Sequence, residues 1–170
     1  FLSTVEIARE PDLRLLHKAF GKIKAYDWII FTSVNAVDIF FTELAARQLD
    51  IRSLQGVRLC AIGPETREQL RLRGLFADIM PRRFCAEGIL QALRGKLKPG
   101  QKVLLPRARN ARPLLPEGLR QQGASVDEIY LYQASVPKNS DKSIIEQIMA
   151  GHIDIITFTS SSTVNNFVKL

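Results

Sequence analysis

The chain has 170 residues, enough for one complete domain and part of another. Hydrophobic residues make up 46% of the chain and charged residues 24%, with a net charge of +7, a composition typical of a globular protein. No apolar run approaches the roughly 18 residues that a membrane helix needs, so we expect no membrane partner. The chain begins at Phe1 without a signal-peptide pattern and stops at Leu170 inside an expected helix, which predicts an internal portion of a longer protein.

Expected strands and helices alternate along the chain. After an extended segment at 1–10 and a helix at 12–20, strands are expected at 27–31, 57–62, 76–80, 102–105 and 126–132, and the helices between them start after Ser33 and cover 64–73, 86–94 and 112–122. Strands separated by helices of this size predict βαβ units and a parallel sheet. A linker at 134–140, a short helix at 141–150 and a further strand at 154–158 complete the pattern.

One motif occurs twice. Residues 27–41 read DWIIFTSVNAVDIFF and residues 154–168 read DIITFTSSSTVNNFV, with seven of fifteen positions identical. Each copy predicts an apolar strand, a hydroxyl-rich turn and the start of a helix, with Ser33 as the N-cap residue in the first copy. α/β proteins usually bind their ligands at such turns. The duplication therefore predicts two similar domains with one such turn each.

Three turns are candidate binding sites, because each joins the carboxyl end of a strand to the start of a helix. Free backbone N–H groups and the helix dipole favour anions there, and side-chain hydroxyls add donors. Plain N-capping explains any single turn as well, whereas the repetition of Phe-Thr-Ser favours a binding role. The candidates are Thr32-Ser33-Val34-Asn35, Gly63-Pro64-Glu65-Thr66 and Thr159-Ser160-Ser161-Ser162.

The positive charge is unevenly placed. Residues 67–120 hold 13 Lys and Arg against four acids, which favours an anionic partner such as nucleic acid, a phosphate or a polycarboxylate, although a solvated basic surface accounts for it too. Arg107, Arg109 and Arg112 follow an expected strand and suit carboxylates or solvent equally. Tyr132 ends the strand at 126–132, where its hydroxyl is either a donor to a leaving group or part of an aromatic packing contact.

No metal or cofactor site is expected. Cys60 and Cys85 lie in apolar settings without a CxxC motif, which predicts buried, reduced thiols in a cytoplasmic protein. His17 and His152 are far apart in sequence and show no metal-ligand spacing. Nucleotide-binding glycine motifs and a Ser-His-Asp pattern are absent from the sequence.

Taken in order, several segments resemble uroporphyrinogen-III synthase of the bacterial type. They are YDWIIFTSVNAV at 26–37, AIGPET at 61–66, FCAEG at 84–88, the stretch from LPR at 105–107 through Arg112, YLYQA at 130–134 and FTSS at 158–161. The resemblance extends over essentially the whole chain. No single segment is decisive, but the ordered set is specific.

The resemblance implies an α/β fold with two flavodoxin-like three-layer domains, whose parallel sheets are joined by two extended linker strands. It also implies that the second domain is incomplete in this chain. Residues 1–26 correspond to a connecting strand and lead-in helix, 27–128 to a complete α/β domain, 129–140 to a connecting strand and linker, and 141–170 to part of the second, discontinuous domain.

The family cyclises hydroxymethylbilane, a linear tetrapyrrole with eight carboxylates, to uroporphyrinogen III in heme biosynthesis, with loss of water and inversion of ring D. The resemblance implies a monomeric lyase without cofactor or metal, whose small-molecule partner is a polycarboxylate tetrapyrrole and not nucleic acid. It implies that Tyr132 is catalytic and that substrate is bound by residues of the three turns and one arginine, namely Thr32, Ser33, Asn35, Gly63, Thr66, Arg107, Ser160, Ser161 and Ser162. A non-catalytic α/β module that binds an anionic ligand remains the alternative.

Overall fold

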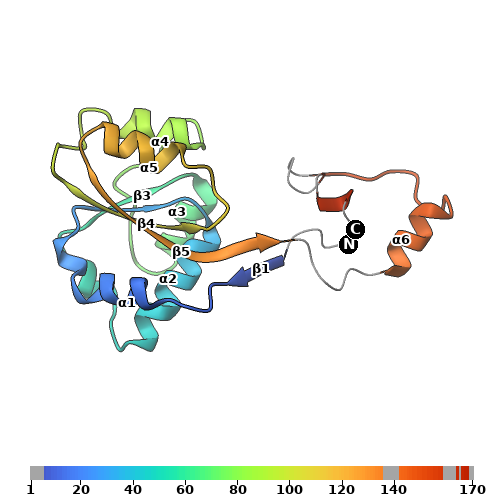
Figure 1. The fold of residues 1–170 in the computed structure, drawn as a ribbon, viewed down its shortest axis with the longest axis horizontal. Coiled ribbons are helices and arrows are strands. Elements are labelled where there is room, and N and C mark those ends of the chain that lie inside the picture. Colours follow the sequence, from blue (N-terminus) through green and yellow to red (C-terminus); the bar gives the residue numbers. More distant parts are fainter. Residues whose placement is uncertain (1–5, 136–141, 159–163, 165, 169–170) are drawn as a thin grey trace. The chain divides into compact units, whose positions relative to one another are not determined.

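The computed structural model describes residues 6–135, 142–158, 164 and 166–168 (Figure 1). The chain divides into two compact units, one formed by Glu10–Tyr132 and the other by Phe1–Arg9 with Gln133–Leu170. In chain order the elements are β1 (Glu6–Arg9), α1 (Arg14–Gly21), the 3₁₀ helix η1 (Ile23–Ala25), β2 (Trp28–Phe31), α2 (Val34–Ala46), the 3₁₀ helix η2 (Ile51–Leu54), β3 (Arg58–Ala61), α3 (Pro64–Arg71), α4 (Ala86–Leu93), β4 (Lys102–Ala108), α5 (Leu114–Gln121), β5 (Ser125–Ser135) and α6 (Lys142–Met149).

The sheet has the strand order β1-β5-β4-β2-β3, and β5, β4, β2 and β3 run parallel. α4 and α5 lie on one face of this sheet, whereas α1 and α2 lie on the other (Figure 1). This is the three-layer α/β architecture that the alternating pattern predicts. The predicted helices between the strands are confirmed as α2, α3, α4 and α5.

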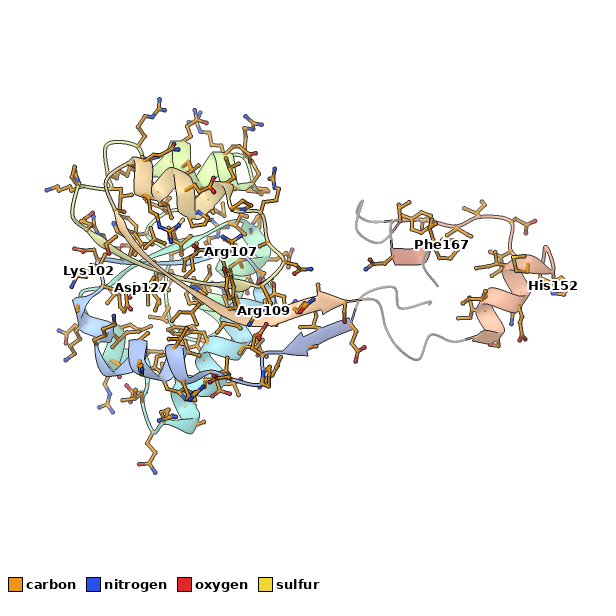
Figure 2. The ribbon with its side chains drawn as sticks, viewed as in Figure 1. Lys102, Arg107, Arg109, Asp127, His152 and Phe167 are labelled. Atoms are coloured by element: carbon orange, nitrogen blue, oxygen red, sulfur yellow. The ribbon has the colours of Figure 1, made fainter. Side chains whose placement is uncertain are left out.

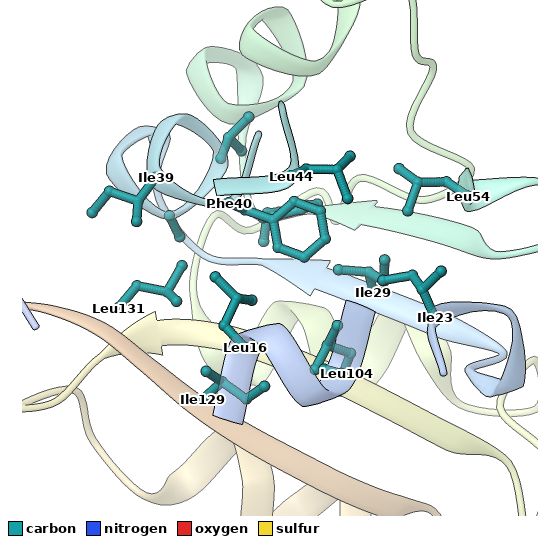
Figure 3. Close-up of a cluster of buried hydrophobic side chains, with 14 of the residues drawn as sticks. Leu16, Ile23, Ile29, Ile39, Phe40, Leu44, Leu54, Leu104, Ile129 and Leu131 are labelled. Atoms are coloured by element: carbon teal, nitrogen blue, oxygen red, sulfur yellow. The ribbon is translucent and has the colours of Figure 1, made fainter. Parts of the chain in front are cut away.

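The interior strand β2 contributes side chains to two hydrophobic cores. Ile29 and Phe31 point into the core beneath α1 and α2, and Trp28 and Ile30 point into the core beneath α4 and α5. All four side chains are buried, as expected for a parallel strand that is covered on both faces. Figure 3 shows the first core, where Phe40 from α2 lies among Ile29, Leu44 and Leu54.

The predicted strand at 76–80 is wrong, because the structure has only a single parallel bridge between Cys60 and Ile79 in this region. The carboxylate of Asp78 accepts the backbone N–H of Leu59 at 2.7 Å and so takes the place of a ladder carbonyl. Phe76 is 79% exposed and provides no burial that would extend the pairing. The side chain of Asp78 thus limits pairing beside β3.

β4 and β5 both run past their predicted ends. β4 continues through Pro106 to Ala108, although proline cannot donate to a ladder. The pairing of β4 with β2 covers Val103 and Leu104 only, so Pro106 lies beyond that ladder while its neighbour β5 continues alongside. Because Pro106 lies beyond the pairing with β2, its lack of an N–H removes no hydrogen bond to that strand.

In the smaller unit, α6 confirms the predicted helix, but the predicted strand at 154–158 is wrong. These residues have no regular secondary structure, and Ile155 is 80% exposed. A strand requires a ladder partner, and none is present for this segment among the described residues. The backbones of Val164, Asn166 and Phe167 are helical, at positions where the second copy of the motif predicts the start of a helix.

Candidate functional site

The first Phe-Thr-Ser turn lies where the direction of the sheet's winding changes. From β2 the chain adds β3 on one side, and it then returns to add β4 and β5 on the other side. In open α/β sheets, ligands bind outside the carboxyl ends of the strands at such a switch point. Thr32, Ser33 and Asn35 follow β2 at that edge, and all three are half-buried.

Ser33 is the N-cap residue of α2, as predicted. Its backbone is extended (φ −164°, ψ 157°), and its Oγ accepts the N–H of Ala36 at 3.0 Å. The same Oγ accepts a second hydrogen bond, from the hydroxyl of Tyr132 at 2.8 Å, across 99 residues of sequence. A serine oxygen has two acceptor sites and one O–H. With both acceptor sites occupied, the O–H of Ser33 is free to donate to a ligand.

A β-bulge directs Tyr132 toward Ser33. Arg107 pairs with Tyr130, but the next residue of β4, Ala108, pairs with Tyr132, so Leu131 is the extra residue of β5. Consecutive strand residues normally face opposite sides of a sheet, yet Leu131 and Tyr132 both pack in the core beneath α1 and α2. Bulges redirect side chains in this way. Tyr132 is consequently 6% exposed, with its hydroxyl at the N-terminus of α2.

The second turn presents a buried hydroxyl. Gly63 is the N-cap of α3 in an extended conformation, and Pro64 occupies the first helical turn. Thr66 is 3% exposed, and its hydroxyl has no hydrogen-bond partner within the described parts of the chain. The ring of Phe84 covers Gly63, since a Cβ there would lie 3.4 Å from the phenylalanine. A buried hydroxyl without a partner is costly, and a ligand at this turn would satisfy it.

The predicted arginine Arg107 is held inside the unit. Its side chain is 4% exposed, and its Nη1 contacts Glu128 at 3.3 Å while Nη2 donates to the carbonyl of Arg112. Arg120 contacts the same Glu128 at 2.8 Å. Figure 2 shows Arg107 and Arg109 toward one end of the sheet, with Lys102 and Asp127 toward the other.

Arg109 and Arg112 differ in how firmly an acidic side chain holds the guanidinium. Arg109 makes a two-bond ion pair with Glu10, with Nε and Nη2 each 2.7 Å from a carboxylate oxygen. Arg112 is 69% exposed and makes one long contact of 3.4 Å with Glu87. Of these three arginines, Arg112 has the most exposed side chain and the longest ion-pair contact, so its guanidinium is the most available to an anion.

The second copy of the turn contributes Ser160, Ser161 and Ser162, and these residues lie outside the described ranges. One local contact of the motif is nevertheless repeated. The rings of Phe31 and Phe40 are 5.3 Å apart, and the rings at the equivalent positions, Phe158 and Phe167, are also 5.3 Å apart. Both pairs have the edge-to-face geometry that aromatic rings prefer.

A cavity of about 710 Å³ opens at the other edge of the sheet, near the amino ends of β2 and β3. It is lined by residues 20–25, 48–50, 52 and 53, and none of the predicted site residues is among them. The chemistry-bearing side chains gather instead at the carboxyl edge, where Tyr132 contacts Ser33. We therefore take the carboxyl edge as the candidate site.

The cysteines carry no site. Cys60 is buried as predicted, and burial raises the pKa of its thiol to about 12. Cys85 is only partly buried, which corrects the prediction, because it is the N-cap residue of α4. Within the described ranges, no three His, Cys, Asp or Glu side chains come together in a way that would hold a metal ion. No helix in those ranges has the length and apolar character needed to cross a bilayer.

Three features of the site could not be read from the sequence. The bulge at Leu131 has no glycine to signal it, and the pairing of Glu10 with Arg109 joins residues that are 99 positions apart. The burial of Arg107 depends on Glu128 in the neighbouring strand. Each of these features depends on the register between neighbouring strands, and local sequence patterns do not predict that register.

Comparisons with known proteins agree in naming one family. The family described as "Uroporphyrinogen-III synthase HemD" matches residues 1–170. A homologue from Methanothermobacter thermautotrophicus is 34% identical over 169 residues, covering 98% of this chain and 66% of that protein. Uroporphyrinogen-III synthase from Synechococcus elongatus is 31% identical over 170 residues, covering 99% of this chain and 64% of that protein.

The solved structures agree on the fold. Uroporphyrinogen III synthase from the bacterium Thermus thermophilus matches with a TM-score of 0.69 at 18% identity, covering 97% of this chain and 64% of that one. The chain thus spans about two thirds of the length of these two relatives. The family match over the full chain, together with these relatives, shows that the protein belongs to the uroporphyrinogen-III synthase HemD family.

Proposed function

We propose that the full-length protein carrying this sequence cyclises hydroxymethylbilane to uroporphyrinogen III, with loss of water and inversion of ring D. The observation that carries the proposal is the hydrogen bond between Tyr132 and Ser33 at the carboxyl edge of the sheet. It joins the proton donor that the resemblance implies to the repeated turn, although the two residues are 99 positions apart. This arrangement lies at the position where an α/β sheet usually binds its ligand.

Tyr132 is proposed to assist departure of the substrate hydroxyl. When substrate binds, the O–H of Tyr132 turns from Ser33 to the leaving hydroxyl and gives it a proton as the carbon–oxygen bond breaks, while the pyrrole nitrogen supplies the electron pair that forms the protonated azafulvene. Attack by the substituted carbon of the terminal pyrrole gives a spiro intermediate, which fragments and closes again. The last ring carbon to be attacked loses its proton, which returns to the phenolate, so the net change is the loss of one water.

The turns are proposed to hold the substrate's carboxylates. At the first turn, the O–H of Ser33, the side chains of Thr32 and Asn35 and the free N–H groups at the start of α2 are the donors. At the second turn, the hydroxyl of Thr66 and the N–H groups beside Gly63 are the donors. Because the azafulvene is intrinsically reactive, fixing the reacting ends in one geometry supplies most of the rate enhancement.

Basic residues are proposed to add a field that attracts the anionic substrate. The chain has a net charge of +7, and the exposed guanidinium of Arg112 lies beside the carboxyl edge. Arg107 takes part through Arg112, whose carbonyl it holds. Ser160, Ser161 and Ser162, in the second copy of the Phe-Thr-Ser turn, remain predicted substrate-binding residues. The proposal includes no cofactor, and it has the protein acting as a monomer in the cytoplasm.

The test is the product that full-length protein makes from freshly prepared hydroxymethylbilane. The proposal predicts uroporphyrinogen III, identified by chromatographic separation of the oxidised isomers, at a rate above spontaneous cyclisation. Heat-denatured protein serves as the control and gives the type I isomer. Only type I product from native protein would overturn the proposal and leave the non-catalytic, anion-binding module as the account of this chain.

A further inference from the structure

Two side chains outside the predicted site meet beside Tyr132. Arg109 follows β4 and Glu10 follows β1, and their guanidinium and carboxylate form two hydrogen bonds of 2.7 Å each. Arg109 also lies over the ring of Tyr130, with its Cζ 5.0 Å from the ring centre. Paired, bidentate geometry of this kind is the strong form of an ion pair.

The backbones of the same two residues hold the bulge. The N–H of Glu10 donates to the carbonyl of Leu131 at 2.9 Å, and the N–H of Arg109 donates to the carbonyl of Tyr132, also at 2.9 Å. Leu131 is the residue that the bulge inserts, and Tyr132 is the residue whose side chain it redirects. The two carbonyls of the bulge are therefore held by two residues that are themselves joined through their side chains.

The acid of this pair is less exposed than the acids of other ion pairs of similar geometry, while the side chain of Arg109 is 51% exposed. The side chain of Glu10 is 10% exposed, whereas the acids of the Asp12–Arg14 and Asp50–Arg52 pairs are 54% and 51% exposed. Exposed pairs contribute little to structure, since solvent screens them. The carboxylate of Glu10 is sheltered and accepts two hydrogen bonds of 2.7 Å from Arg109, which favours keeping the two side chains together.

We infer that Glu10 and Arg109 form a clamp that positions Tyr132 for the reaction. The clamp fixes the bulge, the bulge directs the ring of Tyr132 into the core, and its hydroxyl then reaches Ser33. Glu10 and Arg109 act through Tyr132 and are positioning residues. Arg109, whose guanidinium is occupied by Glu10, does not bind a substrate carboxylate. This inference rests on the proposed function for its catalytic part and on the geometry alone for its structural part.

The test uses full-length protein labelled with 3-fluorotyrosine, with Arg109→Gln, Glu10→Gln, the double variant and Arg109→Lys. The fluorine resonance of Tyr132 is assigned by its absence from Tyr132→Phe. Arg52→Gln is the matched control, because Arg52 makes the same two-bond contact with Asp50 on an exposed surface. Circular dichroism confirms that each variant is folded before the other measurements are compared.

The clamp predicts that the Tyr132 resonance shifts in Arg109→Gln and Glu10→Gln and stays in place in Arg52→Gln. It predicts a fall in kcat of about 10- to 100-fold with KM nearly unchanged, because a misplaced catalytic group lowers the rate more than binding. The double variant loses no more than either single variant, since both break one unit. Arg109→Lys, which keeps the charge but not the two-bond geometry, falls between wild type and Arg109→Gln.

An unshifted Tyr132 resonance in both single variants overturns the clamp, and so does a shifted resonance with unchanged kcat. The resonance measurement requires no turnover. If wild-type protein makes only the type I isomer, the proposed function fails, and the resonance still decides whether Glu10 and Arg109 position Tyr132.

Discussion

Residues 27–41 and 154–168 share seven of fifteen positions, yet β2 in the first copy is buried throughout while residues 154–158 in the second form no strand. The contact between Phe31 and Phe40 nevertheless has its equivalent between Phe158 and Phe167. A contact across nine residues is determined by the motif itself. A strand is stabilised by its neighbours, and β2 has β3 and β4 beside it.

Hydrogen exchange tests the difference between β2 and residues 154–158 most sharply. In the 170-residue chain, amides of β2 exchange only when the whole unit unfolds, which predicts protection factors on the order of 10³ or more. Amides at 154–158 have no ladder partner among the described residues and should exchange within about tenfold of an unstructured peptide. Equal protection of the two segments, measured by mass spectrometry, would contradict the account.

Equivalent phenylalanines should differ in their contribution to stability. Phe31 is fully buried, so Phe31→Ala should lower the free energy of unfolding by about 3–5 kcal/mol. Phe158 is 40% exposed, and Phe158→Ala should cost less than about 1 kcal/mol. Urea denaturation of both variants provides the measurement. Similar losses at the two positions would mean that the second copy is packed like the first.

The N-cap of the first copy should have a smaller effect. Ser33→Ala removes the acceptor of the Ala36 N–H and of the Tyr132 hydroxyl, and we expect a loss of about 0.5–2 kcal/mol in the free energy of unfolding. Ser125→Ala is the control, because this exposed residue begins β5 and caps no helix. Denaturation curves that coincide for Ser33→Ala and wild type would show that the cap contributes nothing.

The smallest effect concerns the pH dependence of the clamp formed by Glu10 and Arg109. The hydrogen bonds from Arg109 hold the pKa of Glu10 below its ordinary value of about 4.3. Its stabilising contribution is therefore fully present above that pH and is lost as the pH falls through the lower, folded-state pKa. The stability difference between wild type and Glu10→Gln should be constant from about pH 6 to 8 and shrink below about pH 4. A difference that grows on acidification would reverse the sign and refute this assignment.

Local sequence patterns predicted the structure correctly where a few consecutive residues determine it. The apolar run of β2, the N-cap role of Ser33 and the Pro64 start of α3 are properties of a few consecutive residues, and all three are confirmed. The predicted strand at 76–80 was wrong because the side chain of Asp78 occupies a ladder position. That competition between a side chain and a backbone carbonyl cannot be read from hydrophobicity.

For the candidate site, the sequence predicted single residues but not the contacts between them. The sequence pointed to Ser33 and Tyr132 separately, through a turn pattern and a family resemblance, but their hydrogen bond depends on the bulge at Leu131. The sequence also proposed Arg107 as an anion grip, whereas Glu128 and the carbonyl of Arg112 occupy its guanidinium. These contacts depend on the register between strands that are far apart in the sequence, and a single sequence does not predict that register.

The central claim is that Tyr132, held on Ser33, donates a proton in the cyclisation. The most direct measurement is the rate of uroporphyrinogen III formation from fresh hydroxymethylbilane by full-length Tyr132→Phe and, as a matched control, Tyr130→Phe. Tyr130 is 37% exposed, lies two residues earlier in β5, and stacks its ring against Arg109. The account predicts a loss of about 10²-fold or more for Tyr132→Phe and a change within about twofold for Tyr130→Phe. Full activity in Tyr132→Phe would contradict it.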